Sequence, residues 1–148
     1  MPEMKVAVIG GTGLYDHLFG LEERQLTVDT KYGQASLKEV TFNKKIVYFM
    51  ARHGEGHSLP PHMINYKANI AALKNLEVDA VISTNAVGSL NKKMEPGSKV
   101  LIDQFIDFTK QRPLTFYEGE AGLVAHTDFT EPYCADIRAA ILRAGKTL

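Results

Sequence analysis

The run VAVIGGTGL, residues 6–14, constrains the fold of this chain more than any other stretch. Its first four residues are apolar and mostly β-branched, and they stop at glycine, which is typical of a short buried strand. The glycines that follow, with Thr12 among them, permit a tight turn whose amide N–H groups and threonine hydroxyl can approach an anion. The run therefore predicts a phosphate site at the carboxyl end of a strand, although a plain tight turn would use the same glycines.

Strand-like and helix-like segments alternate along the rest of the chain. A hairpin turn is expected at Asn43-Lys44. Helices are expected at 61–76, which starts with proline, and at 132–144, which ends before glycine. Strands are expected at 4–9, 26–28, 35–42, 45–50, 80–83 and 99–102.

This alternation predicts an α/β fold with an open, mostly parallel mixed sheet flanked by helices. Only residues 145–148 follow the last expected helix, so no further strand continues the crossover. The sheet is therefore expected to end with an exposed edge, which another chain or further sequence would cover.

Composition favours a small-molecule partner. The 148 residues fit one domain, and 17 basic residues balance 17 acidic ones, so no broad electric field invites nucleic acid or an acidic membrane. Cys134 is the only cysteine, which excludes an internal disulfide and fits a reducing compartment. The apolar run at the start is too short for a secretory signal or a membrane span. A cytoplasmic protein is expected.

A second segment, ARHGEGH at residues 51–57, directly follows an expected strand. In a parallel sheet its side chains would emerge at the carboxyl edge, where α/β folds bind ligands. Arg52 could clamp an oxyanion with two donors, and His53 could donate a further hydrogen bond. A solvated surface arginine and a loop-bracing histidine are the alternatives. The spacing of His53, His57 and His62 matches no zinc motif, so no metal site is expected.

A third segment, VISTNAVGSL at residues 81–90, also runs from a strand into small polar residues. The amide of Ala86 and the side chains of Thr84 or Asn85 could complete an oxyanion cradle. The three strand ends are thus expected to converge on one anion. A dinucleotide site is disfavoured, because the glycines depart from the G-x-G-x-x-G spacing.

Together these segments resemble S-methyl-5′-thioadenosine phosphorylase, a member of the trimeric purine nucleoside phosphorylases. The resemblance covers essentially the whole chain but only the amino-terminal portion of a family member, so residues 1–148 are expected to be the amino-terminal part of a single phosphorylase-like domain. The motifs that carry it are IGGTG at 9–13, ARHG at 51–54, PHMINY at 61–66, NAVGSL at 85–90, DQFID at 103–107, Arg112-Pro113 and Phe116-Tyr117.

The resemblance implies phosphorolysis of S-methyl-5′-thioadenosine to adenine and 5-methylthioribose 1-phosphate, with inorganic phosphate as co-substrate and no metal or organic cofactor. It also implies a homotrimer. The residue that protonates the departing base is expected outside this chain, so no catalytic residue is assigned. The matching positions are Thr12, Arg52, His53, Asn85 and Ala86 for phosphate, Val87 and Gly88 beside the sugar and base, and His126 near the 5′ group of a neighbouring subunit's site.

Two alternatives stay open. Asn85 stands where the methylthioadenosine enzymes usually carry threonine, which leaves a 6-oxopurine or methylthioinosine phosphorylase as an alternative. The other is a catalytically inactive fragment or phosphate-binding module that lacks the base-binding half. A complementing carboxyl-terminal polypeptide would supply that half.

Overall fold

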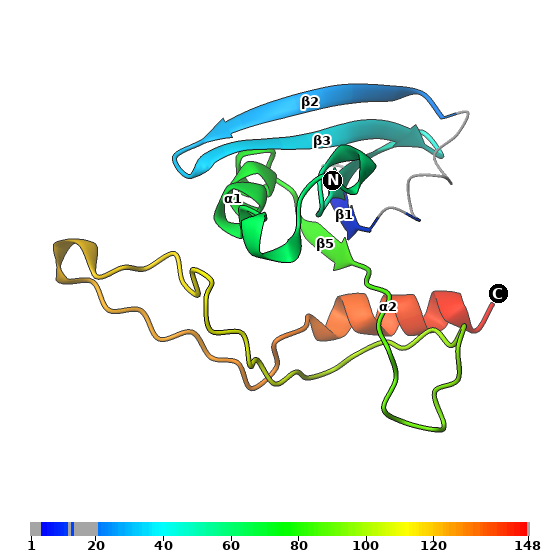
Figure 1. Ribbon diagram of the computed structural model, residues 1–148. Coiled ribbons are helices and arrows are strands. Elements are labelled where there is room, and N and C mark those ends of the chain that lie inside the picture. Colours follow the sequence, from blue (N-terminus) through cyan, green and yellow to red (C-terminus); the bar gives the residue numbers. More distant parts are fainter. Residues whose placement is uncertain (1–3, 12, 14–20, 148) are drawn as a thin grey trace. The chain divides into compact units, whose positions relative to one another are not determined.

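A five-stranded open sheet carries all three strand-end motifs (Figure 1). The computed structural model describes residues 4–11, 13 and 21–147, and the chain divides into two units, Met1–Ala86 and Val87–Leu148, each described by itself. The strands of the first unit are β1 (Val6–Gly10), β2 (Glu23–Thr30), β3 (Gly33–Phe42), β4 (Lys45–Ala51) and β5 (Ala80–Ser83).

The order of the strands is β2-β3-β4-β1-β5. β2, β3 and β4 pair antiparallel, whereas β1 runs parallel to both β4 and β5. The predicted open mixed sheet is thus confirmed, and its parallel part is the trio β4-β1-β5. Two of the four pairings among the described strands are parallel, so the sheet is less parallel than predicted. β5 pairs with β1 alone among the described residues and is an edge strand of this sheet.

The hairpin predicted at Asn43-Lys44 is present. Phe42 pairs with Lys45, so the loop has two residues, and Asn43 and Lys44 have φ of 49° and 65°. Positive φ at both positions defines a type I′ turn, whose twist matches that of the flanking strands.

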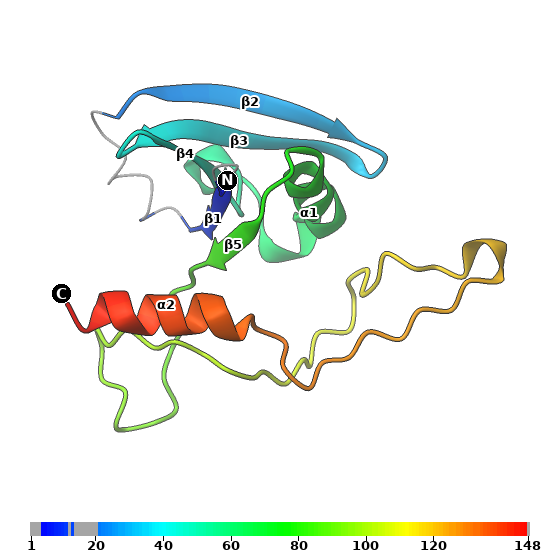
Figure 2. The ribbon, with the colours of Figure 1, turned by 180° about the vertical axis from the view of Figure 1, so that it is seen from behind.

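The hydrophobic core lies between one face of the sheet and the helix α1 (Tyr66–Asn75), which Figures 1 and 2 show against that face. Alternate residues of each strand point to this face because side chains in a strand alternate between its two sides. They pack with Ala72 and Leu73 of the helix, which are buried. The buried sheet residues of this cluster are Ala7, Ala35, Leu37, Tyr48 and Met50.

α1 begins later than the sequence predicted. Residues Pro61–Met63 form the short 3₁₀ turn η3, and Ile64 is extended, with φ −68° and ψ 126°. The Asn65 side chain then caps the helix by accepting a hydrogen bond from the Ala68 amide at 3.0 Å. Its amide nitrogen also donates to the Tyr32 carbonyl at 2.7 Å, which fixes the start of the helix against the β2–β3 turn.

The strand predicted at 99–102 is wrong. The described structure has no strand there, and the side chains of Val100 and Ile102 are about half exposed, at 51% and 49%. A strand exists only where a neighbour accepts and donates its backbone hydrogen bonds, which an apolar sequence alone does not supply.

The second unit is a long extended segment that leads to the helix α2 (Ala135–Gly145), with the short turn η4 (Glu120–Gly122) between (Figure 2). The helix α2 starts at Ala135, three residues later than the predicted start at 132. Arg138 Nε of α2 donates to the Ile102 carbonyl at 3.1 Å, which connects the helix to the earlier part of the segment. None of the helices in the described parts of the chain is long and apolar enough to cross a membrane.

Two Asp-Phe-Thr turns recur in this segment. The amide and hydroxyl of Thr109 donate to one carboxylate oxygen of Asp107 at 2.8 and 2.6 Å, and Thr130 does the same to Asp128. The threonine hydroxyl is the largest cause that lowers the pKa of each carboxyl, followed by the threonine amide. Hydrogen bonds to the ionised form favour that form.

Replacing Lys44 with glycine should stabilise the protein by about 0.5–1 kcal/mol, because glycine adopts a positive φ without steric cost. Urea unfolding followed by circular dichroism measures the change. The matched control is Lys45→Gly, which places glycine in β4 and should destabilise by about 0.5–1 kcal/mol. Equal effects of the two variants would contradict the type I′ assignment.

Thr109→Val should raise the pKa of Asp107 towards its ordinary value, because the variant removes the hydroxyl donor. Since the folded pKa is lowered, the turn's contribution to stability is present above the unfolded carboxyl pKa and is lost as the pH falls through the lowered one. Carboxyl ¹³C chemical shifts followed over pH measure the pKa. Thr130→Val is the reciprocal control, since it should raise the pKa of Asp128 and leave the pKa of Asp107 unchanged.

Candidate functional site

The carboxyl ends of β1, β4 and β5 meet at one edge of the sheet. Gly10 pairs with Ala51, and Ile9 pairs with Ser83. The ladder continues one step beyond the strands: the Arg52 amide donates to the Gly10 carbonyl at 3.1 Å, and the Thr84 amide to the Ile9 carbonyl at 2.9 Å. The structure thus brings the three predicted motifs together, within hydrogen-bonding distance of one another.

The guanidinium of Arg52 is held across this edge. Its Nε donates to His53 Nε2 at 3.3 Å, and its Nη1 donates to the Thr84 carbonyl at 3.1 Å. Its Nη2 faces Gly11, where an added Cβ would lie 3.9 Å from that nitrogen. We call this arrangement of Arg52 between Gly11, His53 and Thr84 the arginine clamp.

The clamp has donors to spare. A guanidinium carries five N–H donors, and these two hydrogen bonds use two of them, which leaves three, all on the Nη atoms. Among the described residues, no carboxylate lies within ion-pair distance of Arg52, which is half-buried. A charged, partly desolvated and uncompensated guanidinium is suited to a bidentate oxyanion.

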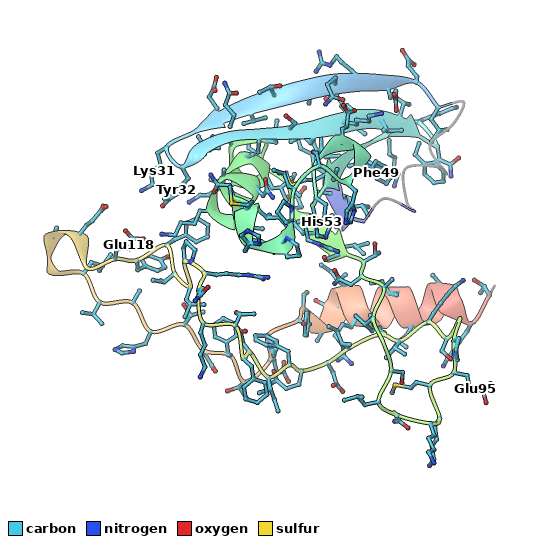
Figure 3. The ribbon with its side chains drawn as sticks, viewed as in Figure 1. Lys31, Tyr32, Phe49, His53, Glu95 and Glu118 are labelled. Carbon is cyan, nitrogen blue, oxygen red and sulfur yellow. The ribbon has the colours of Figure 1, made fainter. Side chains whose placement is uncertain are left out.

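The imidazole of His53 lies at the same edge, where Figure 3 labels it near the ends of β1 and β5. Its Nε2 accepts from Arg52, and its Nδ1 lies 3.0 Å from the Leu59 carbonyl. The ring of His57 stacks on it, with centroids 4.4 Å apart and planes 24° apart. Both ring nitrogens therefore face protein groups, and the donation from His53 to an anion stays a prediction.

The loop between Ala51 and Leu59 folds back on itself. The Leu59 amide donates to the His53 carbonyl at 2.7 Å, and the Gly54 amide donates to the Ala51 carbonyl at 3.0 Å. Gly54 has φ 72°, and a Cβ there would lie 2.7 Å from Ser58 Oγ, so this position requires glycine. The short turn η2 (Glu55–His57) closes the loop and carries His57.

The other predicted site residues are distributed as follows. Thr12 lies outside the described residues. Asn85 and Ala86 directly follow Thr84 and are exposed at the end of the first unit. The predicted sugar, base and 5′ contacts belong to the second unit, which is described by itself, so their roles stay predictions: Val87, Gly88 and His126.

Three groups that contact Arg52 or His53 were not predicted from the sequence. The carbonyls of Thr84 and Leu59 act through the backbone, which leaves no signal in residue type. His57 was weighed only as a metal ligand, and its spacing from His53 across two glycines was the available signal for a stacked pair. In the described ranges no three His, Cys, Asp or Glu side chains gather into a possible metal site.

Known proteins resemble this chain in sequence and in fold. The sequence pattern of the Phosphorylase superfamily matches residues 5–148. The 6-oxopurine nucleoside phosphorylase of Pyrococcus furiosus is 50% identical over 150 residues, which cover 97% of this chain and 56% of that protein. The S-methyl-5′-thioadenosine phosphorylase of Saccharolobus solfataricus is 45% identical over 146 residues, which cover 97% and 53%.

Solved structures of phosphorylases are similar to this chain as well. A methylthioadenosine phosphorylase from an antarctic soil metagenomic library superposes with a TM-score of 0.89 at 38% identity, over 99% of this chain and 51% of that one. The chain belongs to the phosphorylase superfamily. It spans about half the length of the curated relatives that it matches.

Gly54→Ala should loosen the loop that carries the histidines. Gly54 combines φ 72° with ψ 171°, a backbone conformation that is essentially restricted to glycine, and an added Cβ would also meet Ser58 Oγ at 2.7 Å, so we expect a loss of about 1–3 kcal/mol in unfolding free energy. Gly56→Ala is the comparison, because Gly56 has φ 64° and ψ 18°, the left-handed region that alanine adopts at a cost of about 1 kcal/mol, and an added Cβ there meets nothing within 4 Å. Urea unfolding of both variants should show the larger loss for Gly54→Ala, and the reverse order would contradict this account of the loop backbone.

Proposed function

We propose that this chain forms the phosphate-binding part of a purine nucleoside phosphorylase, an enzyme that transfers a ribosyl group to inorganic phosphate. The observation that carries the proposal is the arginine clamp at the meeting ends of three parallel strands. Membership of the phosphorylase superfamily supports it, as do relatives whose names are those of nucleoside phosphorylases.

The proposed reaction needs an anion clamp more than a nucleophilic side chain. A phosphate oxygen forms a bond to the anomeric carbon of the ribose, and the bond from that carbon to the purine nitrogen breaks. The electron pair leaves with the purine, which takes up a proton. Positive charge develops on the sugar as the bond breaks, and a phosphate held beneath it stabilises that charge while it attacks.

Within this proposal Arg52 binds and orients the phosphate. Thr12, Asn85 and Ala86 complete its cradle, and His53 belongs to the cradle through its position beside Arg52. Three N–H donors remain on the Nη atoms of Arg52 for the phosphate oxygens. Val87 and Gly88 lie beside the sugar and base, and His126 serves the 5′ group. From the resemblance to the phosphorylases, we expect the residue that protonates the purine outside this chain.

We propose S-methyl-5′-thioadenosine as the nucleoside, with adenine and 5-methylthioribose 1-phosphate as products. The motifs of the sequence and the relative from Saccharolobus solfataricus support this choice. 6-Oxopurine nucleosides, or methylthioinosine, are the second candidate. Asn85, in place of the usual threonine, and the relative from Pyrococcus furiosus support the second candidate equally.

The remaining parts of the proposal rest on the same resemblance. The two units form the amino-terminal part of one phosphorylase-like domain, with no metal or organic cofactor. The assembly is a cytoplasmic homotrimer, or a complex with a carboxyl-terminal polypeptide that supplies the base-binding residues. A chain that binds phosphate without turnover is the alternative of another class.

The first test offers methylthioadenosine, methylthioinosine, adenosine and inosine in parallel to the purified 148-residue chain and measures release of free purine. Phosphate-dependent release would establish the activity, and the preferred nucleoside would identify the base. Phosphate binding without release would leave the chain as the phosphate-binding part alone. A chain that binds no phosphate and releases no purine would contradict the proposal.

Arg52→Ala should weaken phosphate binding about a hundredfold, because a charge-assisted bidentate contact is lost. Arg52→Lys keeps the charge but loses the planar fork, so an intermediate loss is expected. Isothermal titration with inorganic phosphate measures both. Arg24→Ala is the control, since Arg24 is exposed and pairs with Glu39 in the antiparallel part of the sheet. Unchanged phosphate affinity in a folded Arg52→Ala variant would contradict the clamp.

A further inference from the structure

We propose that His53 acts on Arg52 rather than on the substrate: it is held as the neutral Nδ1–H tautomer and positions the guanidinium, while the ring of His57 holds His53 in place. His53 and His57, which we call the histidine pair, would then be positioning residues. The value of this arrangement for phosphate binding rests on the proposed function, but the arrangement itself can be tested without phosphate.

The two partners of His53 select one tautomer. Arg52 Nε carries a hydrogen and no lone pair, so it can only donate, and His53 Nε2, 3.3 Å away, must accept. The Leu59 carbonyl can only accept, so Nδ1, 3.0 Å from it, must carry the hydrogen. The contact with Arg52 by itself requires the neutral ring with its hydrogen on Nδ1, and the contact with the Leu59 carbonyl also requires a hydrogen on Nδ1.

The other tautomer and the charged ring both fail at this position. Either would place an N–H group of His53 against the N–H group of Arg52 Nε, where no acceptor stands between them. Among the described residues, the groups that face the ring are the Arg52 guanidinium, the Leu59 carbonyl and the His57 ring, and no carboxylate is paired with His53.

The hydrogen bond that Arg52 Nε donates to His53 fixes the orientation of the guanidinium. The contact at Nε and the second contact from Nη1 to the Thr84 carbonyl hold the planar guanidinium at two points. The three remaining donors then face a fixed direction. Holding a flexible side chain in its binding conformation lowers the entropic cost of binding a ligand, so His53 would raise phosphate affinity without contacting phosphate.

His57 has a conformation that suits a holding role. Its φ is 60°, a left-handed value that non-glycine residues rarely adopt, and Gly54 and Gly56 in the same loop also have positive φ. This backbone path places the His57 ring at 4.4 Å from that of His53, nearly parallel to it. Unusual backbone conformations persist where the surrounding structure requires them. The stacked ring covers one face of His53 and limits its rotation.

Two variants of His53 test the contacts of its two ring nitrogens one at a time. His53→Gln places an amide oxygen near the position of Nε2, so it can still accept from Arg52 but cannot reach the Leu59 carbonyl. His53→Asn places an amide nitrogen near the position of Nδ1, so it keeps the contact with Leu59 and loses the acceptor for Arg52. His62→Asn, at an exposed position of η3, is the matched control.

The first measurement needs no ligand. Long-range ¹H–¹⁵N spectra of the wild-type chain, recorded at mildly alkaline pH, report the tautomer of each histidine, and His53→Gln assigns the signal. We expect the Nδ1–H form, and the Nε2–H form would overturn the proposal. The exchange of the Arg52 Nε hydrogen with water should be slow in the wild type and in His53→Gln, and faster in His53→Asn. Equal exchange in the two variants would also overturn it.

Titration with inorganic phosphate then tests the consequence for binding. His53→Gln should stay within about twofold of the wild type, whereas His53→Asn should bind about fivefold more weakly, since one hydrogen bond to the clamp is lost. His57→Phe, which keeps a ring to stack, should bind about as well as the wild type, and His57→Ala about two- to threefold more weakly. A greater loss in His53→Gln than in His53→Asn would assign His53 to the phosphate itself and overturn the proposal. A wild-type chain that binds no phosphate would contradict the proposed function, while the tautomer and exchange results would still decide the role of His53.

Discussion

The parallel pairing of β1 with β4 and β5 is the constraint on which the site depends. Parallel strands end at the same edge, and the register that pairs Gly10 with Ala51 and Ile9 with Ser83 aligns those ends to within a residue. The two backbone hydrogen bonds beyond the strands, from the amides of Arg52 and Thr84, extend this alignment into the loops. A slip of one residue would turn each of these side chains to the other face of the sheet.

The antiparallel part of the sheet supports the helix α1. β2 and β3 add the area on which α1 packs, so Leu37 and Ala35 share the core with Ala72 and Leu73. The Asn65 cap connects the helix to the β2–β3 turn through the Tyr32 carbonyl. The long hairpin and the helix therefore stabilise the strands whose ends carry the clamp, while they contribute no described residue to it.

The clamp combines charge with fixed geometry. Arg52 supplies the charge, and the geometry comes from the Thr84 carbonyl on one strand end and from a loop that returns upon itself on the other. Gly54 is required for this loop because its φ of 72° and ψ of 171° form a combination that essentially only glycine adopts. The chain belongs to the phosphorylase superfamily. The contacts that hold Arg52 come from the ring of His53 and from the backbone carbonyl of Thr84.

The sequence by itself determined the α/β class, the Asn43-Lys44 turn and the three polar strand ends, because local patterns of apolar residues and turn formers act over a few positions. It did not determine the start of α1 at Tyr66 or the absence of a strand at 99–102, since a cap that binds a distant turn and a strand that needs a neighbour both depend on the rest of the fold. Only the tertiary structure decided which donors of Arg52 are used and which groups face the two ring nitrogens of His53. Those outcomes depend on carbonyls, whose positions are set by backbone geometry and leave no trace in residue type.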